Sequence, residues 1–365
     1  MLLNHSESKR QHSNRPTTKY TVATGFITLL LIFSCNSLFA QAQKQNEPFL
    51  LERVRALNLD SLQKGTTTVH FTPGYRNRAE MLGARTERAL QFFKDSLNID
   101  FGKFHLIMPD TSSWKELSVM PYGFAVWGRG GWQHRNLGKS VSGRPASAIV
   151  SVDAEGVIFR QLQNLKKCLS NDDHERLNEI GYSLEEASRR YVEIITIHEL
   201  GHGVVENLDI KVPTVWYSEF LANYFTVIYL YKYEPKEAKI WDLMTAVTLD
   251  CYTPEKSSLE VFYLPGKEGP EYHWLQSNLI QRANKVAENH GFDFIREAKT
   301  IFSEQDSLSQ KVGAIYNNLD RLPKEEVLQR LMEVNEVMIE RLDQIAPGFQ
   351  VWATNIFEQQ TNKAH

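Results

Sequence analysis

The stretch YVEIITIHELGHGVV, Tyr191 to Val205, places His198 and His202 four residues apart, with a glutamate directly after the first histidine. Apolar residues recur every three or four positions from Leu184 to Val205, which predicts one amphipathic helix whose apolar face carries both histidines. Side chains at positions i and i+4 of a helix lie on the same side, one turn apart. Both imidazoles are therefore expected to point together toward the protein interior.

This histidine pair has the spacing of a zinc site. Zinc binds neutral imidazole nitrogens, and two histidines one helical turn apart can hold one ion. Glu199 follows the first histidine and would lie beside the metal, where it can accept a proton from a bound water. The pattern HELGH is not decisive by itself, because two core histidines hydrogen-bonded to the backbone would look the same.

A third ligand is expected in the next helix, VPTVWYSEFLANYFTVIYLY, which begins at Val212. Glu219 is the only acidic residue between Pro213 and Tyr233 in this otherwise apolar and aromatic segment. A buried carboxylate without a partner costs several kcal/mol, so Glu219 needs a cation or hydrogen-bond donors unless it lies at an exposed helix start. One zinc ion per chain would satisfy it, and Asn223, one turn later, is expected to orient a ligand.

Two glycines follow the first histidine within the same predicted helix, Gly201 and Gly203. Each glycine weakens an exposed helix by up to about 1 kcal/mol. That cost is easier to understand if another element or a ligand approaches the helix backbone closely at these positions.

HELGH followed by WYSEFLANYF resembles the gluzincin metallopeptidases, in particular the peptidase MA-like proteins and, more distantly, the thermolysin and aminopeptidase N families. The resemblance covers Thr66 to Tyr233 and extends weakly beyond it. It implies a zincin-like catalytic domain in which His198, His202 and Glu219 bind zinc and Glu199 is the general base.

The sequence departs from the family pattern beside the third ligand. Ser218 and Phe220 replace the asparagine and glycine that usually flank the acid. Asn223 stands where the thermolysin family has an acid, which would leave one histidine less strongly oriented. The loop before Glu219 is also slightly shorter than in those families.

The same resemblance suggests further parts of an active site. In the aminopeptidase N family a tyrosine stabilises the oxyanion, and Tyr272 is similarly placed, with His273 as the neighbouring candidate and a packing role as the alternative. The segment SAIVSVDA, Ser147 to Ala154, resembles the edge strand that pairs with an extended peptide substrate. No segment resembles the one that captures a free amino terminus, which favours an endopeptidase.

The order of the remaining patterns predicts an α+β fold. Strands are expected at TTTVHFTP (66–73), KFHLIMP (103–109) and SAIVSVDA, and a strand and turn at YGFAVWGRGGWQ (122–133). A helix over residues 78–99 is expected between the first two strands. This small twisted sheet and the active-site helices would form a zincin-like catalytic domain at 43–235, followed by a mainly helical domain at 236–365. The apolar face of KEEVLQRLMEVNEVMIERLDQIAPGF, which starts at Lys324, is interpreted as core.

The amino terminus has the pattern of a signal peptide at residues 1–42. A basic stretch precedes the apolar run TVATGFITLLLIF, which is shorter than the roughly 20 residues that span a bilayer. Cleavage after the small-x-small pattern at Ala40 to Ala42 would release the protein, whereas IFSC would tether it by a lipid at Cys35. Release into the periplasm or the medium is favoured, with no integral membrane span after processing.

Charge and cysteine content narrow the possible functions further. The formal net charge of −3 gives no electrostatic footprint for nucleic acid. Apart from Cys35, only Cys168 and Cys251 remain, and they could form one disulfide in an exported chain. The sequence does not show that these two residues are close.

Taken together, these patterns predict an exported zinc metallopeptidase that acts on peptides or proteins. Two alternatives remain open. The chain could hold zinc and bind peptides without hydrolysing them, or it could be a structural exported protein in which HELGH arose by chance.

Overall fold

The computed structural model describes residues 50–118, 120–128, 146–210, 212, 214–252, 270–302, 307–316, 318 and 321–357. The chain divides into two compact units, Met1–Pro48 and Phe49–His365, and all of the described residues belong to the second. The predicted signal peptide, with Cys35, and the end of the strand expected at 122–133 lie outside the described residues.

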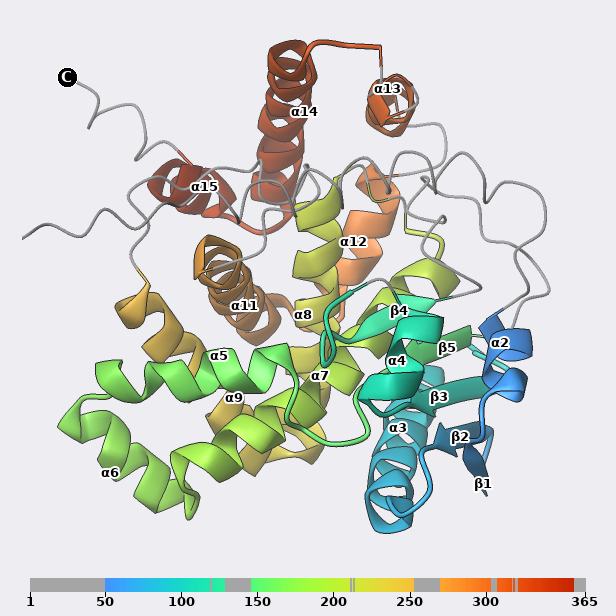
Figure 1. Ribbon diagram of the computed structural model, residues 1–365. Helices are drawn as coiled ribbons and strands as arrows, with labels where there is room; N and C mark the ends of the chain where they lie inside the picture. The colour runs from blue at the N-terminus through green and yellow to red at the C-terminus, as the bar shows by residue number, and fades with distance from the viewer. Residues whose placement is uncertain are drawn as a thin grey trace, which may run out of the picture. The chain divides into compact units, whose positions relative to one another are not determined.

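A five-stranded sheet has the order β1-β2-β3-β5-β4 (Figure 1). β2, β3 and β5 run parallel, and β1 and β4 lie antiparallel to β2 and β5 respectively. The strands are β1 (Asp60–Lys64), β2 (Thr67–Phe71), β3 (Phe104–Met108), β4 (Val126–Gly128) and β5 (Ala146–Ile149).

Helices cover both faces of this sheet. α3 (Arg76–Leu97) connects the parallel strands β2 and β3, since parallel neighbours need a crossover, and it packs against β2. On the other face, α2 (Leu50–Ala56) and α4 (Thr111–Leu117) close a small apolar cluster formed by Val54, Ile107, Trp114, Leu117 and Ile149. The inner strand β5 is fully buried, whereas β1 is largely exposed and β4 is half-buried.

The rest of the described chain is helical. α7 (Leu184–Asn207) begins with a capping box, in which the Ser183 hydroxyl accepts from the Glu186 backbone N–H and the Glu186 carboxylate accepts from that of Ser183. α7 packs along α8 (Val215–Tyr233), and α11 (Pro270–His290) packs on α8 and α9 (Pro235–Cys251). The other helices are α5 (Val157–Gln163), η2 (Asn164–Cys168), α6 (Asn171–Ile180), α12 (Asp293–Ile301), α13 (Ser307–Tyr316), α14 (Lys324–Ile345) and α15 (Phe349–Phe357).

These elements confirm an α+β fold with a small sheet and predominant helices. The apolar face predicted on α14 is buried, which confirms that it belongs to the core. The predicted domain boundary at 235–236 falls at the junction of α8 and α9. The division into a catalytic and a helical domain stays a prediction. Among the described residues, no helix has both the length and the hydropathy to cross a membrane.

The expected edge position of the segment Ser147 to Ala154 is wrong. β5, which contains the start of this segment, lies between β3 and β4, so both of its edges are paired. β4 pairs with the edge of β5 that was expected to be open, and the two edge strands of the described sheet are β4 and β1. Short strands of similar composition do not reveal their order, because order depends on pairing between segments distant in sequence.

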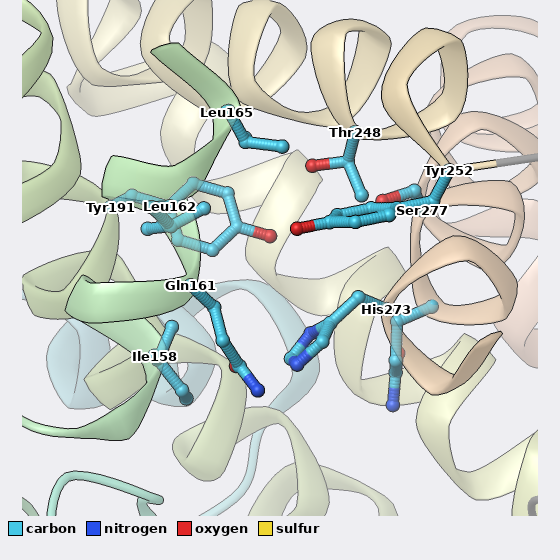
Figure 2. Close-up of a pocket in the computed structure, with 10 residues that line it drawn as sticks. Ile158, Gln161, Leu162, Leu165, Tyr191, Thr248, Tyr252, His273 and Ser277 are labelled. Carbon is cyan, nitrogen blue, oxygen red and sulfur yellow. The ribbon is translucent and has the colours of Figure 1, made fainter. Parts of the chain in front are cut away.

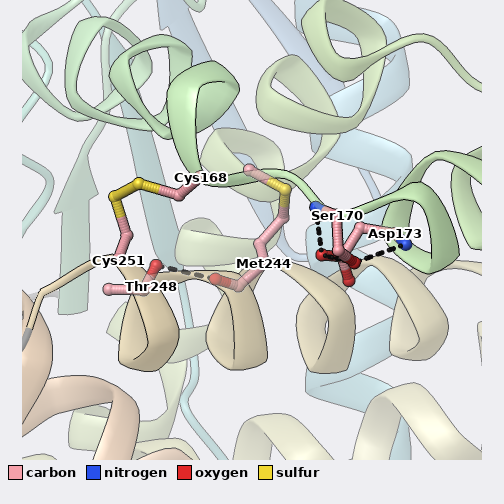
Figure 3. Close-up of a disulfide and its surroundings, with 6 residues drawn as sticks. All are labelled: Cys168, Ser170, Asp173, Met244, Thr248 and Cys251. Atoms are coloured by element: carbon pink, nitrogen blue, oxygen red, sulfur yellow. Dashed lines mark hydrogen bonds between the residues drawn. A yellow bond between two sulfur atoms is a disulfide. The ribbon is translucent and has the colours of Figure 1, made fainter. Parts of the chain in front are cut away.

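A disulfide joins Cys168, at the end of η2, to Cys251, at the end of α9 (Figure 3). Their Cα atoms are 5.4 Å apart, within the range of ordinary disulfides. Thr248, one turn before Cys251, donates from its hydroxyl to the Met244 carbonyl within α9. The pairing that the sequence left open is therefore present.

Removing this disulfide is expected to destabilise the fold substantially. The two cysteines are 83 residues apart in sequence. Cross-linking a loop of that length lowers the conformational entropy of the unfolded chain, which stabilises the folded state by about 4 kcal/mol. The Cys168→Ser/Cys251→Ser variant should therefore lose about 2–5 kcal/mol of unfolding free energy, measured by urea denaturation. An unchanged midpoint in urea would contradict this expectation.

Candidate metal centre

The three predicted ligands meet between two helices. His198 and His202 lie on α7 and Glu219 lies in the second turn of α8, and ligand atoms of all three lie within 4.8 Å of one another. The Nε2 atom of His198 is 3.3 Å from Glu219 Oε2, and that of His202 is 3.8 Å from Glu219 Oε1. One side chain of α8 thus faces both imidazoles at once, and the group could hold a metal ion.

The electrostatics of this group favour a cation. Burial opposes the charge of the Glu219 carboxylate, but the adjacent His202 and His198 outweigh burial and lower its pKa to about 2. Burial likewise opposes charge on His198, but the hydrogen bond and charge of Glu219 prevail and raise its pKa. The carboxylate therefore stays ionised in a largely buried position, where it requires positive charge.

The outer nitrogens of both imidazoles are held by α8. His198 Nδ1 is 2.9 Å from the Asn223 side-chain oxygen, and His202 Nδ1 is 3.1 Å from the Ser218 hydroxyl. An amide oxygen only accepts, so His198 donates from Nδ1 and presents Nε2 toward Glu219. This arrangement is the one that orients a metal-binding histidine.

Both glycines of the first motif lie where another element approaches α7. A Cβ atom at Gly201 would lie 2.6 Å from the carbonyl oxygen of Ala222 on α8. A Cβ atom at Gly203 would lie 2.2 Å from the ring of Trp127 on β4. The expected close approach is therefore confirmed at both positions, and at Gly201 it allows α8 to pack close to the helix that carries the histidines.

Gly201→Ala is expected to destabilise the protein although alanine is the better helix former. The added methyl group meets backbone atoms of α8 rather than a flexible side chain, so the two helices must separate. Overpacking of this kind costs about 1–3 kcal/mol, more than the roughly 1 kcal/mol gained in helix propensity. Urea denaturation measures the difference, and a variant more stable than the wild type would contradict the reason given.

Glu199 lies on α7 directly after the first ligand and is 7% exposed. Its charge acts on His198 and contributes to the raised pKa of that residue. The structure therefore places a buried acid next to the metal-binding group, at the position predicted for the general base.

The two candidates on α11 lie in different surroundings. Tyr272 accepts a hydrogen bond from the Gln276 amide nitrogen at 2.9 Å, and that nitrogen also donates to Glu219 Oε2 at 2.7 Å. Gln276 therefore bridges Tyr272 and Glu219. His273 lines a cavity together with Tyr191 and Thr248 (Figure 2), and burial lowers its pKa to about 4.

Sequence reasoning missed Gln276 and the contact of Ser218. Gln276 lies 57 residues beyond Glu219, and no pattern near it indicates a metal site. Ser218 was noted only as a departure from the family pattern. A hydroxyl directly before the third ligand is a weak signal that could have been used.

The donor set suits zinc. Two imidazole nitrogens and one carboxylate form a common three-ligand zinc site that leaves a position for water or substrate. Within the part of the chain that the structure describes, no other set of three His, Cys, Asp or Glu residues brings its ligand atoms as close together.

Comparisons with protein-family models, with curated proteins and with solved structures found no match to this chain. Its function is therefore inferred from the residues and geometry of the site itself.

Proposed function

We propose that this protein is an exported zinc metallopeptidase that hydrolyses internal peptide bonds. The observation that carries the proposal is the convergence of His198, His202 and Glu219 with a buried Glu199 beside them. A metal site that only stabilised the fold would need no acid in that position, and a chance motif would not gather a third ligand from another helix.

The fold supports a zincin-like catalytic unit. In such a unit, two active-site helices lie beside a small sheet, and an extended peptide can add to an exposed sheet edge. Here α7 and α8 carry the ligands, and β4 packs against α7 through Trp127 and Gly203. β4 therefore takes the substrate-pairing role that the sequence pattern suggested for β5.

Each residue of the site has a chemical task in this proposal. Bound zinc would supply a Lewis acid that polarises the substrate carbonyl and lowers the pKa of water. Glu199 accepts the proton of the attacking water and passes it to the leaving amine. Tyr272 donates its hydroxyl proton to the oxyanion that develops on the carbonyl. Asn223 and Ser218 hold the imidazoles in the orientation that metal binding needs.

Export is part of the proposal as well. The disulfide between Cys168 and Cys251 supports it, because such bonds persist in oxidising compartments. Release into the periplasm or the medium remains favoured over a lipid anchor at Cys35.

The proposal is tested by incubating a diverse peptide mixture with the purified protein and with its Glu199→Gln variant. Mass spectrometry should find new peptide ends with the wild type that are absent with the variant, and cuts away from chain termini indicate an endopeptidase. If both proteins bind zinc and neither cuts any peptide, the protein is a peptide-binding or structural zinc protein instead.

A further inference from the structure

A chain of hydrogen bonds connects two of the proposed metal ligands through side chains that do not bind the metal. His198 Nδ1 is 2.9 Å from Asn223 Oδ1, and Asn223 Nδ2 donates to Gln276 Oε1 at 3.2 Å. Gln276 Nε2 in turn donates to Glu219 Oε2 at 2.7 Å. Since Glu219 Oε2 lies 3.3 Å from His198 Nε2, the chain closes into a ring across α7, α8 and α11.

The direction of every bond in this ring follows from one charge. An ionised carboxylate only accepts, so the Gln276 amide must turn its nitrogen toward Glu219 and its oxygen toward Asn223. Asn223 must then turn its nitrogen toward Gln276 and its oxygen toward His198. His198 is left with its proton on Nδ1 and its Nε2 lone pair directed at the metal position. Two neutral amides thus transmit the orientation set by Glu219 to His198.

We propose that Gln276 is a positioning residue of the metal centre, acting on Glu219 directly and on His198 through Asn223. This inference rests on the proposed binding of zinc by His198, His202 and Glu219. It explains how Asn223 can replace the acid of the thermolysin family. A lone asparagine is free to turn either way, and Gln276 selects the orientation that serves the histidine.

The ring also gives α11 a direct role at the metal centre. Asn223 is 1% exposed, so little water can replace Gln276 as its partner. The amide nitrogen of Gln276 additionally donates to the Tyr272 hydroxyl, so the same side chain orients the proposed oxyanion donor one turn earlier on α11. Loss of Gln276 would therefore disturb Glu219, the Asn223 partner of His198, and Tyr272 together.

The test measures zinc affinity by competition with a chelator for the full-length wild type, Gln276→Met and Gln276→Asn. Methionine keeps the length of the side chain without its hydrogen bonds, and asparagine keeps the amide but is one methylene too short to bridge both partners. Each variant should bind zinc about 10- to 100-fold more weakly, the usual effect of removing an outer partner of a ligand. The visible spectrum of the Co²⁺-loaded variants should change as well, because the ligands lose their fixed orientation.

Asn284→Ala is the matched control for these variants. Asn284 also lies on α11 and donates from its amide to a carboxylate of another helix, Asp242 Oδ1, at 2.7 Å. Its removal should lower thermal stability but leave zinc affinity and the Co²⁺ spectrum unchanged. Equal zinc affinity of the wild type, Asn284→Ala and both Gln276 variants would overturn the inference while leaving the proposed metal site intact. A wild type that binds no zinc would overturn both.

A double-mutant cycle tests whether the ring acts as a unit. If Gln276 orients Asn223, the Asn223→Leu/Gln276→Met variant should lose less affinity than the sum of the two single losses. If each residue served its own ligand independently, the two losses would add, and the transmission from Glu219 to His198 would be disproved.

Discussion

Glu199→Gln is expected to lower the rate of peptide hydrolysis by about 10²- to 10⁴-fold, while the zinc content stays unchanged. The change removes the carboxylate proposed to accept the proton of the attacking water, and general-base catalysis contributes this much. The amide has the same shape, and Glu199 is not among the three ligands, so the metal-binding group remains. The measurement is the initial rate on one peptide found in the mixture, with zinc determined on the same sample.

Glu206→Gln is the matched control for this prediction. Glu206 lies on the same helix, two turns after Glu199, and is exposed. It undergoes the same chemical change, and its rate should stay close to that of the wild type. Wild-type hydrolysis by Glu199→Gln would show that another group accepts the proton or that the cutting activity belongs elsewhere.

Glu219→Gln is expected to abolish stoichiometric zinc binding. The variant loses the only negative charge among the three ligands, and it leaves two imidazoles facing a neutral amide in a largely buried position. Removing an outer partner costs about 10- to 100-fold in metal affinity, so removing a charged ligand should cost more than about 100-fold. Chelator competition and elemental analysis measure the loss, and hydrolysis should disappear with the metal.

The two variants separate two causes of inactivity. Glu199→Gln should keep the metal and lose the reaction, whereas Glu219→Gln should lose both. Zinc binding by Glu219→Gln at wild-type affinity would remove Glu219 from the ligand set. The carboxylate would then be a hydrogen-bonding partner of the two histidines and Gln276 only.

Much of the fold could be predicted because its helices have strong local patterns. α7 and α8 lie where the periodicity of their segments indicated, and so do the strands β2 and β3. β1, α2 and α4 were not predicted, because segments of five to seven residues are too short to show a clear periodicity. Such elements are stabilised by their neighbours in space more than by local preference.

Local sequence patterns were enough to predict the residues of the candidate metal site and most of their arrangement. Histidines at i and i+4 share a helix face whatever surrounds them, and an isolated acid in an apolar helix must find a cation or a donor. The glycines of HELGHG indicated close packing in a similar way. Glycine destabilises a helix, so its presence is explained where another element approaches the helix backbone.

Which distant residues meet became visible only in the folded chain. The tertiary structure paired Cys168 with Cys251, placed β4 rather than β5 at the sheet edge, and brought Gln276 of α11 to Glu219. Local periodicity encodes which face of an element is buried, but not which partner covers that face. That choice depends on the packing of the whole chain, in which contacts over many residues of sequence are selected together.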